Sequence, residues 1–119
     1  LFRCIERGLD FKYTAGLHHT LRADHALTYQ PEAPHAVMHG YMNVFLAAAF
    51  LQFGVPAAAA VEILDETDLA AFDLFGDGVA WRGNRLSADQ LIRARRKALA
   101  FGSCSFVEPI DDLKTAGLL

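Results

Sequence analysis

The sequence has neither a long hydrophobic run nor an excess of basic residues. Its longest apolar stretch, residues 44–53, is interrupted by Gln52 and followed by Gly54, far short of the roughly 20 residues that cross a bilayer. The chain has 11 Lys and Arg against 14 Asp and Glu, a net charge of −3, whereas nucleic-acid-binding proteins carry basic patches. We therefore expect neither a membrane nor a nucleic acid among its partners.

Cysteine is also scarce. Cys4 and Cys104 are 100 positions apart, and the N-terminal residues contain no apolar signal-peptide core. This pattern is typical of a reducing compartment rather than of a secreted disulfide scaffold, so we expect a cytoplasmic protein. The H-E-x-x-H and C-x-x-C spacings that identify common zinc sites do not occur.

Apolar side chains, in contrast, are abundant and make up 53% of the 119 residues. This length suits one domain with one core, and the high apolar content predicts surface that meets another chain or a further segment. Residues 1–8 resemble the last turns of a helix that stops at Gly8. We expect residues 1–119 to be a single domain or the C-terminal fragment of a larger domain. Its apolar surplus would then contact a second copy of the chain or a missing N-terminal segment of the same protein.

Aromatic residues predict a strand within residues 9–17. Strand alternation assigns its two faces as follows: Phe11, Tyr13 and Ala15 on an apolar face, and Lys12 and Thr14 on a polar face. If the strand belongs to a barrel, Lys12 enters the lumen, where desolvation makes a lysine a Schiff-base nucleophile or an anion anchor. The alternative is an edge-strand lysine that faces water.

Caps, breakers and periodicity predict the other elements. Residues 20–39 are predicted to be a long loop, because Pro31 and Pro34 exclude a long helix before residue 34. Ser87 and Gln90 form an S-x-x-Q capping box, which predicts a helix over residues 88–100. The remaining predicted elements are helices from 39 or 41 to 53 and at 57–64, 65–75 and 108–113, and strands at 79–81 and 101–107.

The order of these elements indicates the fold class. A helix between two strands is the βα pattern of a parallel sheet. We therefore predict an α/β fold, mostly helical by residue count, with two or three short parallel strands. We interpret it as the C-terminal part of a (βα) barrel, in which sites lie at the carboxyl ends of the strands.

All five histidines fall within residues 18–39: His18, His19, His25, His35 and His39. Imidazoles gathered at a strand end can bind a divalent metal such as zinc. If Pro34 begins a helix, His35 and His39 share one face of it. The alternative is a set of solvated or merely hydrogen-bonded imidazoles. We expect His18 or His19 to be the principal ligand or general acid/base, because a strand end is rigid.

The second long strand, at 101–107, repeats the division into two faces. Ser103 and Ser105 share its polar face, and Cys104 is assigned to the apolar face as a small core residue. If the two strands are neighbours, Thr14 and both serines line one surface with Glu108 at its rim, which makes these four the substrate-binding candidates. For the serines, the alternative is a simple hydrogen-bonding role, since neither has an adjacent base in the sequence.

Three segments are similar to the C-terminal part of a family of longer, uncharacterised bacterial proteins. They are T-A-G-L-H-H at 14–19, H-G-Y-M-N-V-F-L-A-A-A at 39–49 and F-G-S-C-S-F at 101–106. The resemblance covers nearly the whole chain and implies that the three segments belong together. It implies no activity and no catalytic residue.

Taken together, these patterns predict part of an enzyme that acts on a small molecule. Its catalytic candidates are Lys12, His18 and His19. The alternative is a non-catalytic helical module for oligomerisation or binding, in which the histidines are incidental. The two hypotheses differ in whether the three candidates converge in one concave pocket.

Overall fold

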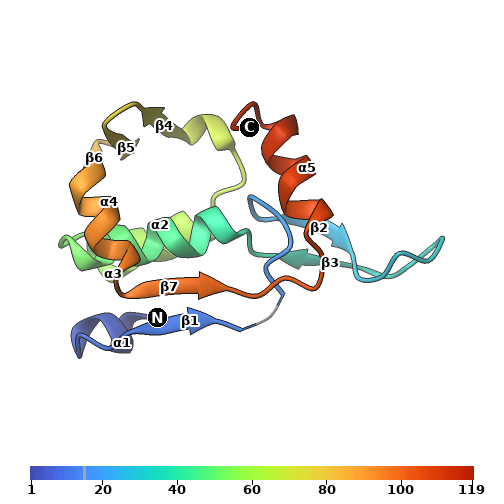
Figure 1. The fold of residues 1–119 in the computed structure, drawn as a ribbon, viewed down its shortest axis with the longest axis horizontal. Helices are drawn as coiled ribbons and strands as arrows, with labels where there is room; N and C mark the ends of the chain where they lie inside the picture. The colour runs from blue at the N-terminus through green and yellow to red at the C-terminus, as the bar shows by residue number, and fades with distance from the viewer. Residues whose placement is uncertain (15) are drawn as a thin grey trace.

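The computed structural model describes residues 1–14 and 16–119, so the predicted facing of Ala15 lies outside the described residues. Those residues form five α-helices, one short 3-10 helix and seven strands (Figure 1). In chain order the elements are α1 (Phe2–Glu6), β1 (Phe11–Tyr13), β2 (Ala23–Ala26), β3 (His35–Met38), α2 (Tyr41–Gln52), α3 (Ala57–Asp65), η1 (Leu69–Ala71), β4 (Phe72–Phe75), β5 (Gly78–Trp81), β6 (Asn84–Ser87), α4 (Ala88–Arg95), β7 (Ala98–Phe101) and α5 (Val107–Thr115).

The prediction of a parallel sheet derived from a barrel is wrong. In the described part of the chain only β1 and β7 pair in parallel; β2–β3 and β4–β5–β6 are antiparallel, and no sheet exceeds three strands or closes. Local turn chemistry explains the difference. Arg82 and Gly83 connect β5 to β6 with φ values of 43° and 80°, as a type I′ hairpin turn requires, and such a turn returns the chain antiparallel.

Four predicted elements also differ in type or in boundary. The expected loop over 20–39 contains the β2–β3 hairpin, and residues 69–75 form η1 and β4 instead of a helix. The helix predicted to residue 100 ends at Arg95, and the second strand begins at Ala98. Here strand pairing outweighs helix propensity, since the Phe11 N–H donates to the Lys97 carbonyl at 2.8 Å and β7 continues along β1.

The predicted helix ends are confirmed where a cap marks them. Ser87 Oγ accepts from the Gln90 N–H at 3.3 Å, and Gln90 Oε1 accepts from the Ser87 N–H at 2.8 Å, which completes the capping box. Helix α2 ends before Gly54, whose φ of 93° turns the chain so that the following Val55 N–H donates to the Phe50 carbonyl at 3.0 Å.

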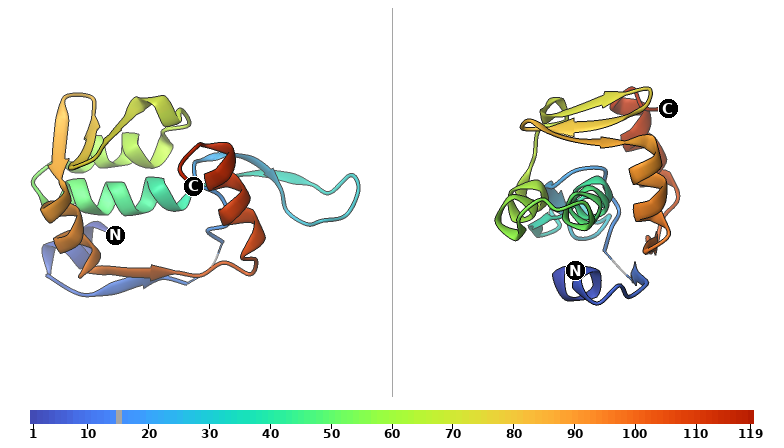
Figure 2. Two further views of the ribbon diagram at one scale, coloured as in Figure 1. Left: turned by 45° about the horizontal axis from the view of Figure 1, so that its top comes forward. Right: turned by 90° about the vertical axis from the view of Figure 1, so that its left-hand side faces the viewer.

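Helix α2 is the centre of the core. It packs beside α3, with the β4–β5–β6 sheet on one side of the helix pair and α1 and β1 on the other (Figure 2). The buried core residues are Leu46, Ala47, Ala49, Phe50, Ala60, Ile63, Phe72, Val79, Trp81, Leu86 and Ala94. This packing on several sides explains why α2 is apolar almost all round. None of the helices in residues 1–14 and 16–119 has the length and apolarity to cross a membrane.

Asn43 is the fully buried polar residue of α2. Its Oδ1 accepts from the N–H groups of Arg22, at 2.8 Å, and Gly40, at 3.2 Å. Its Nδ2 donates to the carbonyls of Ile63, at 2.9 Å, and Glu66, at 2.8 Å. Every hydrogen-bonding position of the amide is used. One side chain therefore connects the segment before β2, the start of α2 and the end of α3.

The first turn of α2 also fixes the segment that follows β1. The first N–H groups of a helix need external acceptors, and those of Tyr41 and Met42 donate to the carbonyls of His19, at 2.9 Å, and Thr20, at 3.1 Å. Gly40 permits this approach, because a Cβ at this position would overlap the Thr20 carbonyl oxygen and the Leu21 backbone. The start of α2 thus determines where the two adjacent histidines lie.

Candidate functional site

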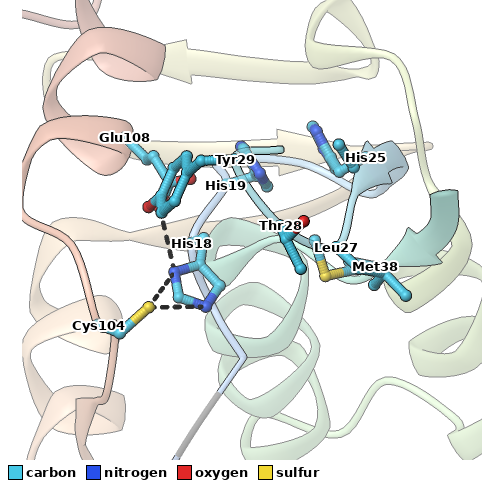
Figure 3. A pocket seen from close by; sticks show the side chains of 10 residues that line it. His18, His19, His25, Leu27, Thr28, Tyr29, Met38, Cys104 and Glu108 are labelled. Atoms are coloured by element: carbon cyan, nitrogen blue, oxygen red, sulfur yellow. Dashed lines mark hydrogen bonds and ion pairs between the residues drawn. The ribbon is translucent and has the colours of Figure 1, made fainter. Parts of the chain in front are cut away.

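His18 and His19 line a cavity between the segment after β1, the β2–β3 hairpin and the first half of α5 (Figure 3). The cavity encloses about 200 Å³. We call it the histidine pocket; its polar lining residues are His18, His19, His25, Thr28, Tyr29, Cys104 and Glu108. The pocket therefore combines residues from four separate stretches of the chain.

His18 is held at one ring nitrogen. Its Nδ1 lies 2.9 Å from Ser103 Oγ and 3.2 Å from Glu108 Oε2, and its side chain is 18% exposed. Ser103 Oγ donates its hydrogen to the Ser105 carbonyl at 2.8 Å, so it can only accept from the imidazole. Nδ1 therefore carries the hydrogen, and Nε2 has the lone pair.

His19 also has a carboxylate of α5 beside its Nδ1, one helix turn further on, and here the contact is a hydrogen bond. Its Nδ1 lies 3.1 Å from Asp112 Oδ2, and this oxygen also accepts from the Thr20 N–H at 3.0 Å. Glu108 and Asp112 are four residues apart on α5, so both carboxylates lie on one helix face. The structure thus forms two imidazole–carboxylate pairs, each with the histidine Nε2 left to accept a proton.

His25, in β2, lies flat against His19. The ring centroids are 3.4 Å apart and the planes differ by 4°. Its Nε2 is buried and has no hydrogen-bond partner among the described residues. Burial, together with the positive charge that His19 can carry, lowers the pKa of His25 below its usual value. Near neutral pH His25 is therefore an uncharged imidazole.

Lys12 and Thr14 lie outside the histidine pocket. Both are exposed and line a separate groove together with His39. Of the three catalytic candidates, the structure brings only His18 and His19 together. The roles assigned to Lys12 and Thr14 stay predictions, although Thr14 also lines a second groove together with His18, Ser103 and Cys104.

The remaining histidines are also apart from the pocket. Pro34 does not begin a helix: His35 opens β3, and its Nδ1 lies 3.6 Å from Asp24 Oδ1 on the surface. His39 Nδ1 lies 2.9 Å from the Leu64 carbonyl. Within residues 1–14 and 16–119 no group of three or more His, Cys, Asp or Glu side chains has the arrangement of a metal site. Metal binding by the five histidines stays a prediction.

The segment 102–106 is a loop rather than the predicted strand, so its side chains do not alternate between two faces. Ser105 Oγ accepts from the N–H groups of Val107, at 3.1 Å, and Glu108, at 3.5 Å, and thereby begins α5. The placement of Cys104 in the core is wrong: its side chain is exposed and lines the histidine pocket. Substrate binding by Ser103, Ser105 and Glu108 stays a prediction.

Asp112 and Cys104 were not predicted from the sequence as site residues. A signal for Asp112 was present, because Glu108 and Asp112 have the i, i+4 spacing within a predicted helix. No pattern indicated that Cys104 would face His18, since that contact depends on where β7 ends. The candidates named from the sequence thus included the imidazoles of the pocket and Glu108, but not Asp112, which contacts His19 from outside the pocket lining.

Comparisons with known proteins gave no match, either to a protein-family model, to a curated protein or to a solved structure. The resemblance of residues 14–19, 39–49 and 101–106 to uncharacterised bacterial proteins stays a prediction.

Proposed function

We propose that the chain carries the acid–base part of an enzyme site for a small molecule, with His18 and His19 as the proton-transferring groups. One observation supports this most directly: each imidazole is held at Nδ1, and the two carboxylates beside them come from one face of α5. A carboxylate at Nδ1 fixes the tautomer and stabilises the imidazolium that forms when Nε2 takes a proton. Two such pairs side by side can serve as general base and general acid.

The size of the pocket limits the ligand. About 200 Å³ is less than the roughly 300–1,000 Å³ of pockets that hold drug-sized ligands. Leu27 and Met38 contribute apolar surface beside the imidazoles. The site therefore suits a compound of a few heavy atoms with one polar, reactive group. The free thiols of Cys4 and Cys104 fit the reducing conditions of a cytoplasm.

Hydrolysis of p-nitrophenyl acetate tests this proposal. We expect His18→Gln and His19→Gln each to lower the rate by about tenfold or more, because general acid–base catalysis contributes about 10²–10⁴-fold. Asp112→Asn removes the charge beside His19 and should lower the rate less. Asp111→Asn is the matched control, because Asp111 directly precedes Asp112 on the same helix. The side chain of Asp111 is 62% exposed and lies 3.6 Å from Lys114 Nζ.

Fluorescence of Trp81, the single tryptophan, which is 2% exposed, verifies that each variant is folded. The proposal is overturned if both histidine variants keep the wild-type rate. It is also overturned if the protein hydrolyses the ester no faster than free imidazole at the same concentration.

The alternative is a non-catalytic module for oligomerisation or binding, and one observation favours it. Several large apolar side chains are exposed, among them Phe106 at 88% and Val107 at 65%, beside the N-terminus of α5. Exposed apolar patches often mark interaction surfaces. These residues do not line the histidine pocket, so self-association through them is compatible with a site for a small molecule.

A further inference from the structure

The exposed thiol of Cys104 lies against His18. Its Sγ is 3.8 Å from both Nδ1 and Nε2 of the imidazole (Figure 3). Nδ1 already has Ser103 Oγ and Glu108 Oε2 beside it. Nε2 is therefore the atom that can take the thiol proton. The equal distances show that the sulfur is not yet in line with Nε2, which is common in sites without a bound substrate.

Glu108 favours proton transfer from Cys104 to His18. Its Oε2 is buried, has no hydrogen-bond partner among the described residues and lies 3.2 Å from His18 Nδ1. A desolvated carboxylate oxygen is costly unless a positive charge forms beside it. Proton transfer from Cys104 to His18 forms such a charge. Glu108, His18 and Cys104 thus have the order of orienting group, base and nucleophile.

The other nucleophiles of the site do not have this arrangement. The hydroxyl hydrogen of Ser103 is donated to the Ser105 carbonyl, so this oxygen cannot pass a proton to His18. Cys4, the other thiol of the chain, belongs to α1 and does not line the pocket.

We propose that Cys104 is a covalent nucleophile for small acyl esters or thioesters, with His18 as its base. This inference rests on the proposed acid–base site and names its substrate class. A thioester can form directly at the thiol, and a pocket of about 200 Å³ holds an acyl group of a few carbons.

The reaction needs no oxidant or cofactor. His18 Nε2 takes the thiol proton, the sulfur attacks the carbonyl carbon, and a C–S bond forms as the bond to the leaving group breaks. The leaving group departs with the proton from His18. Water then attacks the thioester carbonyl carbon as His18 takes one of its protons, a C–O bond forms, the C–S bond breaks, and His18 returns that proton to the sulfur as the acid is released.

The test is an acid-quenched time course with p-nitrophenyl acetate, followed by intact-mass analysis and peptide mapping. We expect a burst of p-nitrophenol equal to the protein concentration, and one acetyl group on Cys104. Cys104→Ala should abolish both, whereas the matched control Cys4→Ala should keep both. Trp81 fluorescence verifies folding in each variant.

A pH series tests the role of His18. His18→Gln should slow the burst about tenfold or more near pH 7, because the thiolate is the nucleophile and a neutral thiol needs a base to form it. The difference should shrink above about pH 9.5, because the thiolate then forms without one. A burst that is equally slow at every pH contradicts His18 as the base.

The outcomes separate this inference from the acid–base site. If Cys104→Ala keeps the wild-type rate while His19→Gln lowers it, the nucleophile is refuted and the acid–base site stands. If neither Cys104→Ala nor the histidine variants change the rate, both proposals fail. Equal acetylation of Cys4 and Cys104 in the folded protein also overturns the inference, since it shows ordinary thiol reactivity.

Discussion

The core around α2 and the histidine pocket differ in how completely their buried polar groups are hydrogen-bonded. In the core, Asn43 is fully buried and uses every hydrogen-bonding position. In the pocket, His25 Nε2 and Glu108 Oε2 are buried without a hydrogen-bond partner in the described part of the chain. The two regions meet at residues 19–20, whose carbonyls accept from the first turn of α2.

The difference separates stability from reactivity. A buried polar group with all its partners contributes to a unique fold, whereas one without partners costs free energy and remains able to bind something else. In the core, the Asn43 side chain has no free donor or acceptor. In the pocket, His25 and Glu108 each keep a polar atom that has no hydrogen-bond partner among the described residues and could contact a ligand. Substitutions on the two sides should therefore have different consequences.

The largest effect is expected in the core, from Asn43→Asp. This change keeps the shape of the side chain but places a carboxylate oxygen against the carbonyls of Ile63 and Glu66, which lose their donor. We expect the free energy of unfolding to fall by about 3–5 kcal/mol. Urea unfolding followed by Trp81 fluorescence measures it.

Asn84→Asp is the matched control, because it makes the same amide-to-carboxylate change at a half-buried residue that opens β6 and donates one side-chain hydrogen bond, to the Arg82 carbonyl at 3.5 Å. We expect a change within about 0.5 kcal/mol there. Equal losses of unfolding free energy at the two positions would contradict a stabilising role for the hydrogen bonds of Asn43.

A smaller effect is expected where the two regions meet, from Gly40→Ala. The new Cβ would overlap the Thr20 carbonyl oxygen and must displace backbone rather than a flexible side chain. We expect a loss of about 2 kcal/mol, typical of overpacking. The displacement should also move His19, so ester hydrolysis should fall together with stability.

Gly76→Ala serves as the control for this change. Gly76 has φ outside the left-handed region, and a Cβ there would meet no atom within 4 Å. A stable Gly40→Ala protein with full activity would refute the contact between α2 and the histidine segment.

The smallest effect is expected in the pocket, from the titration of His25. Its pKa in the folded protein lies below the ordinary value of 6.5, because burial and His19 disfavour the charged form and outweigh Asp112, Asp24 and Glu108. Below about pH 6.5 the unfolded chain binds a proton at His25 that the folded chain does not. The free energy of unfolding should therefore decrease as the pH falls from 6.5 towards the folded pKa, by less than about 1.4 kcal/mol per pH unit.

His25→Gln should remove this part of the pH dependence, measured by urea unfolding between pH 5 and about pH 8. His35→Gln, on the same hairpin but exposed, should leave it unchanged. An identical slope in the wild type and in His25→Gln would contradict the burial of a neutral His25.

The parts of the fold that local chemistry specifies could be predicted from the sequence. The capping box at Ser87 and the glycine after residue 53 mark helix ends through contacts within a few residues, and the structure confirms both. Residues 98–101 could not be predicted in the same way. They continue a helical pattern, and only pairing with β1, more than 80 positions earlier, makes them a strand.

The site follows the same division. His18 and His19 were named as candidates from the sequence, but the strand end expected there lies five residues earlier, at Tyr13. The positions of their carboxylate partners depend on contacts across the fold. Asp112 Oδ2 accepts from the Thr20 N–H, and the Tyr41 hydroxyl donates to the Pro109 carbonyl at 3.3 Å. These contacts set the position of α5, and no local pattern encodes them. The prediction for Cys104 failed because strand alternation was assumed where the chain forms a loop.

Helix α5 carries both carboxylates on nine residues, with Glu108 and Asp112 one turn apart. A rigid helix cannot move one of these groups without the other. A displacement of α5 along its axis would therefore withdraw both acids from both imidazoles in one step. The two imidazole–carboxylate pairs therefore depend on the position of a single helix.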